Sequence, residues 1–345
     1  MLEDIKLGHF RCFEHFEASF QPGLNLILGP NAHGKTSLLE AICVLLRLQS
    51  PRTPRLAEII QHGARGLLVD GHACGKHLQF YFSPQRKKLA LDSVEQSSAS
   101  DYLLTERVVW FSNTDVEIVR GSAEQRRRFL DFLASQIRPD YRRALRDYDR
   151  ALRSRNLLLK SPTSRWREIS AFDPLLLSNG RQITLARSEL LTALLPLAQL
   201  AHTAISTGRE KFDALYRPGA GSPFPDSLEP ARLEDLRLRQ STVGPHRDDW
   251  ELSLSGHPAA LGSEGQQRTL ALALRLAAAR LLEAHFGAPP LLLFDDIFGE
   301  LDLARRSALL RELPANAQQI VTTTQIEWLP PGLHAPEIRL GPSPG

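Results

Sequence analysis

Residues 24–37 read LNLILGPNAHGKTS, and this stretch predicts the fold of the chain. An apolar run leads into the octet GPNAHGKT at residues 29–36, which fits the pattern G-x-x-x-x-G-K-[ST], and an apolar, helix-forming segment follows it. Strand, glycine loop and helix in this order are the context of a phosphate-binding P-loop. The glycines let successive N–H groups face phosphate oxygens, and the helix adds its positive dipole end. The sequence therefore predicts a nucleoside triphosphate site; a plain glycine-rich turn before a helix is the alternative.

Two side chains of the octet carry specific chemistry. Lys35 supplies a compact positive charge for the β- and γ-phosphates, and the hydroxyl of Thr36 suits a Mg²⁺ ion. His33 occupies a variable position of the motif and is interpreted as a spacer. The candidate nucleotide-binding residues of this segment are Gly29, Pro30, Asn31, Ala32, His33, Gly34, Lys35, Thr36 and Ser37.

A second carboxylate is needed to complete a Mg²⁺ site beside a P-loop. Residues 291–294 are four apolar residues, and Asp295 and Asp296 follow them. This pattern is typical of the Walker B strand. It predicts that Asp295 contacts Mg²⁺ through a water molecule. Asp296 points to the other side of the strand end and is the candidate for orienting the attacking water. A capped strand end with two solvated aspartates is the alternative.

The segment Ser263-Glu264-Gly265-Gln266 resembles the signature loop of the ABC-type ATPases. A hydroxyl, a glycine and a glutamine at a helix N-terminus bind anions through free N–H groups and the helix dipole. The resemblance implies that Ser263, Gly265 and Gln266 close over the γ-phosphate held by a second subunit. An ordinary helix cap is the alternative. The position favours the first interpretation, because one predicted helix separates this loop from Asp295, as in that superfamily.

Composition limits the class of protein. The chain has 345 residues, enough for two domains, and its 42% hydrophobic and 23% charged residues are ordinary values for a soluble protein. No apolar run is long enough for a transmembrane helix, and the N-terminus lacks the features of a signal peptide. Cys12, Cys43 and Cys74 are interpreted as reduced core thiols of a cytoplasmic protein. A net charge of +3 does not by itself indicate nucleic acid.

Periodicity predicts strands around a helical middle segment. Residues 93–101 are predicted as a mobile loop tip, residues 217–230 as a linker, and the Pro-rich end as a tail. Helical spacing covers residues 123–160 and 172–215, and further helices are predicted at 266–285 and 303–313. The predicted strands are three within residues 2–28, then 66–70, 77–83, 87–92, 108–112, 233–240, 250–254, 291–294 and 319–324.

The helical segment contains a stripe of arginines. Residues 126–155 hold ten Arg and four Asp, and Arg142, Arg146, Arg150 and Arg153 are spaced to share one helix face. Such a stripe can bind nucleic-acid phosphates. A solvated helix face partly paired with its own aspartates explains it equally well. Arg52 and Arg55 are further DNA-binding candidates.

Five segments carry a family resemblance along essentially the whole chain. They are GPNAHGKTSLLEAI, RVVWFSNTDVEIVRGSAEQRRRFLD, STVGPHRDDWEL, SEGQQR and LLLFDDIFGELD. In this order they resemble the RecF family of bacterial recombination-mediator ATPases. The resemblance implies an α/β fold: an ABC-type P-loop ATPase head with a compact helical second lobe. The expected domains are residues 1–118 and 231–345, two parts of the ATPase lobe, and 119–230, the helical lobe.

The resemblance also implies a function. It implies ATP with Mg²⁺ as cofactors, an ATP-dependent homodimer, slow ATP hydrolysis, and binding to duplex DNA and single-strand/duplex junctions, with no membrane contact. The implied partners are RecR and RecO, which cooperate in loading RecA recombinase at gaps during DNA repair, replication restart and the SOS response. A transporter-type ABC ATPase subunit and an ATP-switched protein-interaction module are the alternatives.

The chain departs from the family pattern at several positions. Asn113-Thr114 stands where Pro-Glu is frequent, Gly299 where serine is common, and residues 322–324 offer hydroxyls where related ATPases place a histidine. Asp296 replaces the usual glutamate and is shorter by about 1.5 Å. Because a misplacement of about 1 Å can slow a reaction about 10²-fold, we expect slow hydrolysis.

Overall fold

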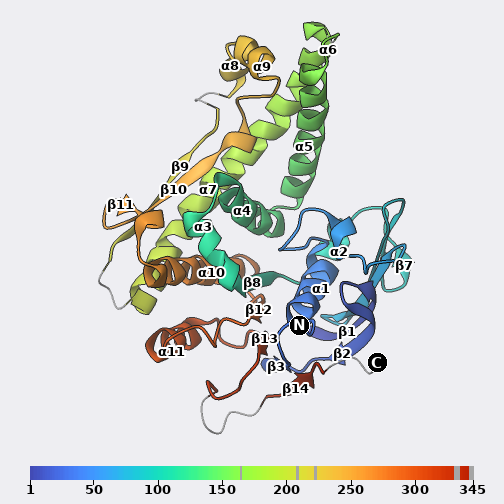
Figure 1. Ribbon diagram of the computed structural model, residues 1–345, viewed down its shortest axis with the longest axis vertical. Helices are drawn as coiled ribbons and strands as arrows, with labels where there is room; N and C mark the ends of the chain where they lie inside the picture. Colours follow the sequence, from blue (N-terminus) through green and yellow to red (C-terminus); the bar gives the residue numbers. More distant parts are fainter. Residues whose placement is uncertain (164, 207–209, 221–223, 330–334, 342–345) are drawn as a thin grey trace. The chain divides into compact units, whose positions relative to one another are not determined.

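The computed structural model describes residues 1–163, 165–206, 210–220, 224–329 and 335–341. These residues form two compact units (Figure 1). Unit 1 combines Met1–Thr114 with Ala278–Gly345, and unit 2 is Asp115–Ala277. The predicted lobes at 1–118, 119–230 and 231–345 stay a prediction, since the compact units divide the chain at other positions.

A parallel sheet of five strands organises unit 1. Its strand order is β14-β3-β13-β12-β8, and every pair in it is parallel. The inner strands β3, β12 and β13 are buried over most of their length, as expected for strands covered on both faces. All carboxyl ends therefore lie at one edge, where the P-loop follows β3 and Asp295 ends β12. The strands are β3 (Leu24–Leu28), β8 (Val108–Ser112), β12 (Leu291–Asp295), β13 (Gln319–Thr323) and β14 (Glu337–Arg339).

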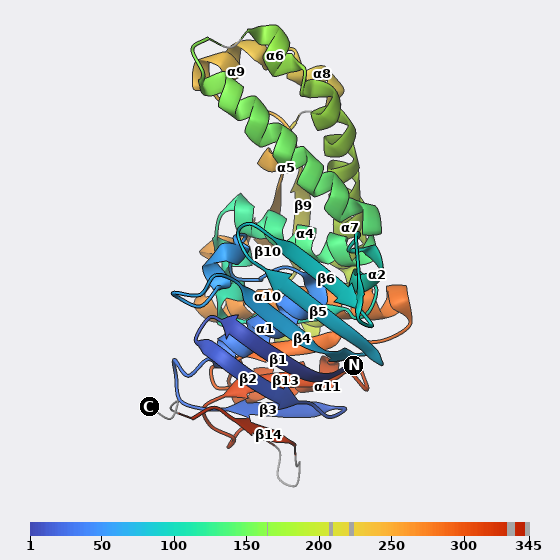
Figure 2. The ribbon, with the colours of Figure 1, turned by 90° about the vertical axis from the view of Figure 1, so that its right-hand side faces the viewer.

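A second, antiparallel sheet of six strands completes unit 1 (Figure 2). Its order is β2-β1-β4-β5-β6-β7, and residues of β4 alternate between buried and more exposed positions. Helix α1 (Lys35–Arg47), which follows the P-loop, is buried along almost its whole length and contacts strands of both sheets. The strands are β1 (Leu2–Phe10), β2 (Phe13–Ser19), β4 (Leu67–Ala73), β5 (Lys76–Phe82), β6 (Lys87–Leu91) and β7 (Val94–Glu95). The other helices of this unit are η1 (Leu56–Ile59), α2 (Ser100–Leu103) and α11 (Leu303–Glu312).

Unit 2 is mainly helical and carries a small antiparallel sheet in the order β11-β10-β9. Its long helices α5 and α7 contact each other, and α4 contacts both. Helix α10 (Glu264–Phe286) begins in this unit and continues into unit 1. The main helices are α3 (Val116–Arg120), α4 (Ala123–Ile137), α5 (Pro139–Lys160), α6 (Trp166–Ser170), α7 (Asp173–Ser206), α8 (Pro225–Leu228) and α9 (Arg232–Leu238). The strands are β9 (Phe212–Arg217), β10 (Asp249–Leu254) and β11 (His257–Pro258), with short 3-10 turns η2 (Asn113–Asp115), η3 (Pro245–Arg247) and η4 (Ala259–Leu261).

Most predicted elements are confirmed, and several predictions are wrong. Residues 233–240 were expected as a strand but lie in helix α9 and its C-terminal end, where buried Asp235 accepts hydrogen bonds from Arg155 and Thr242. The predicted helix 172–215 stops at Ser206, because the following segment pairs with β10 as strand β9.

Three segments predicted without regular structure contain some. The loop at 93–101 holds β7 and the start of α2, and the predicted linker 217–230 holds α8; its residues 221–223 lie outside the described residues. The Pro-rich tail contains β14, which pairs with β3. Short elements of this kind are set by tertiary pairing, which periodicity does not reveal.

No helix in the described ranges is both long enough and apolar enough to cross a membrane.

A buried ionic network in unit 2 joins two of the segments that carry the family resemblance. Arg187 of α7 is almost fully buried and donates to both carboxylate oxygens of Asp131, at 2.8 and 2.9 Å, and to Asp248, at 2.9 Å. Arg126 binds Asp249 through two hydrogen bonds, at 2.6 and 3.0 Å. The segments RRRFLD (126–131) and GPHRDD (244–249) are thus connected both directly and through Arg187.

We predict that Arg187→Met destabilises the protein strongly. The substitution leaves the buried carboxylate of Asp248 and the partly buried carboxylate of Asp131 without their shared cation, and breaking a buried ion pair in this way costs about 3–5 kcal/mol. Urea unfolding followed by circular dichroism measures the change. The exposed pair of Arg143 and Asp140 supplies the control, since Arg143→Met should change stability by less than about 0.5 kcal/mol. Equal effects of the two substitutions would contradict a structural role for the network.

Candidate nucleotide site

The P-loop has the geometry of a phosphate cradle. Its Lys35 ammonium is buried and donates to the carbonyl oxygens of Gly29, at 2.7 Å, and Pro30, at 3.1 Å. Gly34 adopts a left-handed φ of 90°, and a Cβ there would lie 2.6 Å from the ring of Phe13. Helix α1 begins directly after Gly34, so its N–H groups and dipole are available to an anion. His33 is partly exposed, and its Nδ1 lies 3.0 Å from the carbonyl oxygen of Asn31.

The P-loop hydroxyl and the Walker B carboxylate meet as the sequence predicts. The hydroxyl of Thr36 donates to Asp295 Oδ1 at 2.8 Å, across 259 residues of chain. Burial raises the pKa of Asp295, while hydrogen bonds from Thr36 and Thr322 oppose this shift. A hydroxyl and a carboxylate are hard oxygen ligands that fit Mg²⁺, which takes few protein ligands and completes its shell with phosphate and water. Among the described residues, no group of three or more His, Cys, Asp or Glu could hold a metal.

A cavity of about 290 Å³ opens beside these residues. Asp296 lines this cavity together with residues of the P-loop. The φ of Asp296 is 53°, which places its backbone in the left-handed region. Aspartate and asparagine tolerate that region better than longer side chains, which is a local reason for aspartate here. The lining residues are Cys12, Asn31, Ala32, Gly34, Lys35, Thr36, Ser37, Arg52 and Asp296.

Two residues that the sequence argument treated as departures organise the Walker B end. Thr322 of β13 accepts from the backbone N–H of Asp296 at 3.0 Å, and its hydroxyl lies 3.2 Å from Asp295 Oδ1. The side-chain amide of Asn113 donates to Glu300 at 2.7 Å and to the carbonyl oxygen of Asp296 at 3.3 Å. Asn113 follows β8 and Thr322 lies near the end of β13, and both strands pair with β12. Their place at the carboxyl ends of strands next to β12 is the feature from which the sequence could have predicted them as site residues.

Arg52, predicted as a DNA-binding candidate, lines the nucleotide cavity. It lies 3.2 Å from the fully buried carboxylate of Glu40, on α1. Arg11 binds the same carboxylate at 2.8 and 2.9 Å, and Ser50 donates to it at 2.5 Å. Two guanidinium groups and a hydroxyl thus neutralise one buried charge next to the P-loop helix.

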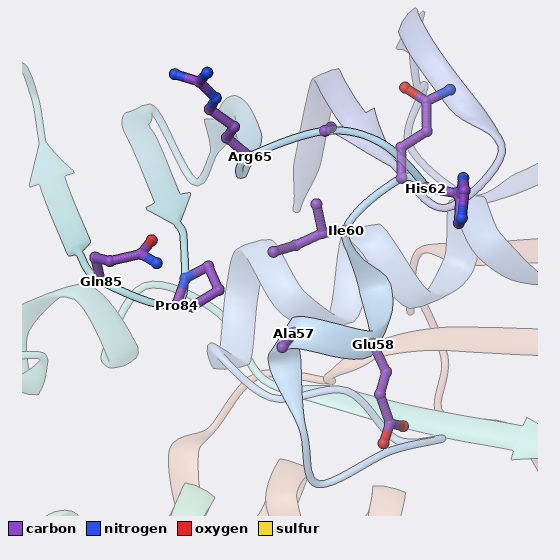
Figure 3. Close-up of a pocket in the computed structure, with 9 residues that line it drawn as sticks. Ala57, Glu58, Ile60, His62, Arg65, Pro84 and Gln85 are labelled. Atoms are coloured by element: carbon purple, nitrogen blue, oxygen red, sulfur yellow. The ribbon is translucent and has the colours of Figure 1, made fainter.

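Arg55, the other candidate in this region, is exposed and lies 3.4 Å from Glu58. Glu58 lines a second, open hollow of unit 1, of about 900 Å³. Figure 3 shows this hollow between the loop that carries Ile60 and Arg65 and the turn that carries Pro84 and Gln85. Arg65 and His62 add basic groups to its border, which the sequence argument did not single out.

The signature-like segment forms a reciprocal helix cap. The backbone N–H of Ser263 donates to the side chain of Gln266 at 2.6 Å, and the backbone N–H of Gln266 donates to the Ser263 hydroxyl at 3.3 Å. The Gln266 amide also donates to Glu210. Gly265 lies in the first turn of α10. The helix-cap interpretation thus describes the single chain, and a role of this segment in a second subunit stays a prediction.

The predicted arginine stripe lies on α5. Arg146 and Arg150 are exposed, and Arg146 lies 3.1 Å from Asp147. Arg142 is only partly exposed, and burial together with neighbouring Arg146 lowers its pKa to about 10. The exposed members of the stripe are therefore the better candidates for phosphate contacts.

The expectation of three core thiols is wrong for two of them. Cys43 is buried, whereas Cys12 and Cys74 are exposed, and none of these three cysteines forms a disulfide. Cys12 lies in the β1–β2 turn and borders the nucleotide cavity.

Comparison with known proteins agrees with this site. Residues 1–330 match the family model described as RecF/RecN/SMC N terminal domain. A protein of Synechococcus sp. (strain JA-2-3B'a(2-13)), named "DNA replication and repair protein RecF", is 36% identical over 94% of this chain and 91% of its own. A protein of the same name from Symbiobacterium thermophilum is 35% identical, over 95% and 92%.

Solved structures give the same result. The structure "of the recombination mediator protein RecF-ATP in RecFOR pathway" superimposes with a TM-score of 0.85 at 29% identity and covers 94% of this chain and 92% of that one. A chromosome-structure (Smc) head bound to a domain of ScpA has a TM-score of 0.52 at 17% identity, which shows a shared fold alone.

The fold and the site define an ABC-type P-loop ATPase head, as the sequence predicts. Within that class the chain belongs to the RecF family, whose curated members match it over nearly their whole length. The transporter-type alternative is not favoured by these relatives.

We predict that Thr322→Val slows nucleotide hydrolysis about tenfold. Valine leaves the N–H of Asp296 without its hydroxyl acceptor and leaves Asp295 Oδ1 with the Thr36 hydroxyl alone. We expect this loss of hydrogen bonding to cost about 1–1.5 kcal/mol in the positioning of the two carboxylates. The measurement is steady-state phosphate release at saturating Mg²⁺ and ATP. Thr324→Val, at an exposed position on the same segment, is the control and should leave the rate unchanged. A T322V rate equal to that of the control would show that this hydroxyl does not position the carboxylates.

Proposed function

We propose that this protein is an ATP-dependent, DNA-binding recombination mediator. One observation carries the proposal: the Thr36 hydroxyl and the Asp295 carboxylate meet at 2.8 Å beside a lysine-bearing P-loop. This pairing is the arrangement that holds Mg²⁺ against nucleotide phosphates. The relatives support the rest, since they are named for DNA replication and repair and one was solved with ATP.

In the proposed nucleotide complex, the Lys35 ammonium exchanges its carbonyl partners for the β- and γ-phosphates. Thr36 and Asp295 would hold Mg²⁺, and the backbone N–H groups of residues 31–37 would donate to the phosphates. The buried Glu40 keeps Arg52 at the border of the cavity, where its guanidinium can approach the phosphate chain.

Asp296 is proposed to orient the attacking water, and hydrolysis is proposed to be slow. Its carboxylate borders the cavity, but its side chain is shorter than the glutamate usual in related ATPases. A slow reaction suits a timer that keeps a complex assembled. Wild-type turnover above about 10 per second in the phosphate-release assay would contradict this part of the proposal.

ATP is proposed to join two copies of the chain. Ser263, Gly265 and Gln266 of one copy would bind the γ-phosphate held by the P-loop of the other. The support is chemical: the segment is a helix N-terminus whose capping bonds are reversible and whose dipole favours an anion. The resulting dimer would clamp DNA at single-strand gaps in the cytoplasm and cooperate with RecR and RecO in loading recombinase.

DNA is proposed to bind through its phosphates, without sequence preference. Arg146 and Arg150 of α5 are the leading contacts, with Arg142 contributing less because of its partial burial. Arg55 and Arg65 at the open hollow of unit 1 are further candidates. Arg52 is proposed to act at the nucleotide cavity, which it lines, and is a weaker candidate for DNA contact.

We predict that nucleotide binding and pairing can be separated by two substitutions. Lys35→Met should abolish ATP binding, and with it dimer formation, because the phosphate charge loses its buried cation. Ser263→Arg should keep ATP binding but block pairing by placing a bulky cation at the cap. Sedimentation with ATP, with ADP and without nucleotide measures both effects. An S263R chain that still dimerises with ATP would remove the role of Ser263 in the partner's site.

We predict that Arg146→Ala with Arg150→Ala weakens DNA binding in a salt-dependent way. Each lost phosphate contact lowers the slope of log affinity against log salt by about 0.9. Gel retardation of duplex DNA with ATP, at several salt concentrations, measures the slope. Arg237, which is paired with Glu234 on α9, gives the control substitution Arg237→Ala. No retardation of the wild type with ATP would favour the alternative of a protein-interaction module.

A further inference from the structure

The C-terminal strand of unit 1 lies beside the strand that leads into the P-loop. Strand β14 pairs in parallel with β3, with Glu337 opposite Leu26 and Arg339 opposite Leu28. The N–H of Leu26 donates to the carbonyl oxygen of Pro336 at 2.9 Å. Both ribbon views show β14 next to β3 (Figures 1 and 2). A segment remote in the sequence thus forms one edge of the nucleotide-binding sheet.

The pairing continues past β14 to the first glycine of the P-loop. The N–H of Leu340 donates to the carbonyl oxygen of Leu28 at 2.7 Å, and Leu340 itself is buried. A Cβ placed on Gly29 would lie 2.5 Å from the carbonyl oxygen of Leu340 and 3.2 Å from its Cβ. Backbone therefore presses directly against backbone where the strand ends and the loop begins.

Gly29 in turn contacts the cation of the site. Its carbonyl oxygen accepts from the Lys35 ammonium at 2.7 Å, the shorter of the two carbonyl contacts described for that group. The position of the Gly29 peptide, fixed on one side by Leu340, determines where the ammonium lies on the other side. The chain of contacts runs from Leu340 through Gly29 to Lys35.

We propose that β14 and Leu340 are a positioning element for the phosphate cradle. The segment acts by holding Gly29 in place and makes no contact with nucleotide itself. The proposal rests on the proposed ATP site. It predicts that loosening the C-terminal strand lowers ATP affinity although every P-loop residue remains.

The geometry also assigns a reason for glycine at position 29. Gly34 has a positive φ, whereas Gly29 is not among the described residues with positive φ. Close approach of Leu340, rather than a left-handed backbone, excludes a side chain at Gly29. The two glycines of the motif thus have different constraints: Gly34 has a positive φ and lies against Phe13, whereas Gly29 is limited by the close approach of Leu340.

Adjacent residues of β14 provide a matched pair of substitutions. Leu340→Pro removes the N–H that bonds to Leu28. Arg339→Pro removes an N–H that faces the open edge of the sheet, since β14 is the edge strand and its bonds to β3 come from alternate residues. Proline is tolerated at such an edge position. Both variants introduce proline, and only L340P loses a bond to β3; L340P also removes a buried leucine side chain, whereas Arg339 is exposed.

We expect L340P to bind a fluorescent ATP analogue at least about tenfold more weakly than R339P and wild type. A change of this size corresponds to the loss of one charge-assisted hydrogen bond between the Lys35 ammonium and a phosphate oxygen. In steady state, the KM for ATP should rise while kcat stays unchanged, because Asp296 and Thr322 are untouched. A purely structural effect of proline would lower the melting temperature of both variants without changing affinity. Equal affinities of L340P and R339P would overturn the proposal.

A second comparison covers the case in which L340P does not fold. Gly29→Ala leaves the sequence of β14 and Leu340 unchanged but forces Leu340 away from the P-loop, so it should also weaken ATP binding about tenfold or more. Gly341→Ala is the control, because a Cβ there meets nothing within 4 Å among the described residues. A G29A variant with wild-type affinity would overturn the proposal. Absence of ATP binding by the wild type would instead reject the proposed function on which it depends.

Discussion

The hydrogen bond between Thr36 and Asp295 depends on a sheet whose strands all run in one direction. Parallel pairing brings the carboxyl ends of β3, β12 and β13 to one edge, and the loops that follow them must then share that edge. The bond is short and joins residues 259 positions apart. Parallel pairing thus brings together the P-loop, the Walker B carboxylates and Thr322, which would otherwise lie apart. The chemistry of the site is therefore a consequence of strand direction.

Each of three charged groups at the nucleotide site has polar or ionic partners. Lys35 is buried against carbonyl oxygens, Glu40 is buried against two arginines, and the partly buried Asp295 lies against two hydroxyls. A buried charge is costly unless it is partnered, and these partners hold the groups ready for a phosphate and a metal. In unit 2 the same rule applies to Arg187, which joins the RRRFLD and GPHRDD segments through Asp131 and Asp248. These residues therefore contribute to the packing of that unit.

The sequence predicted the P-loop, the Walker B strand and the central strands because each is a local pattern with a specific physical meaning. It failed for Leu233–Leu238, where a short helix is fixed by contacts of Asp235, and for the C-terminal segment, where pairing with β3 makes a strand. Thr322 and Asn113 were interpreted as departures from a pattern. Their hydrogen bonds to the Walker B end give them a positive role that no motif described.

By itself, the sequence determined the phosphate loop, the order of the ATPase elements and the family, because glycine spacing, apolar runs and terminal carboxylates act over a few residues. Only the tertiary structure decided that Arg52 borders the nucleotide cavity, that Arg142 is partly buried, and that Gly29 is in contact with Leu340. Each of these depends on which distant segment fills the neighbouring space. Burial and close approach are properties of packing, and packing joins residues that the linear chain keeps hundreds of positions apart.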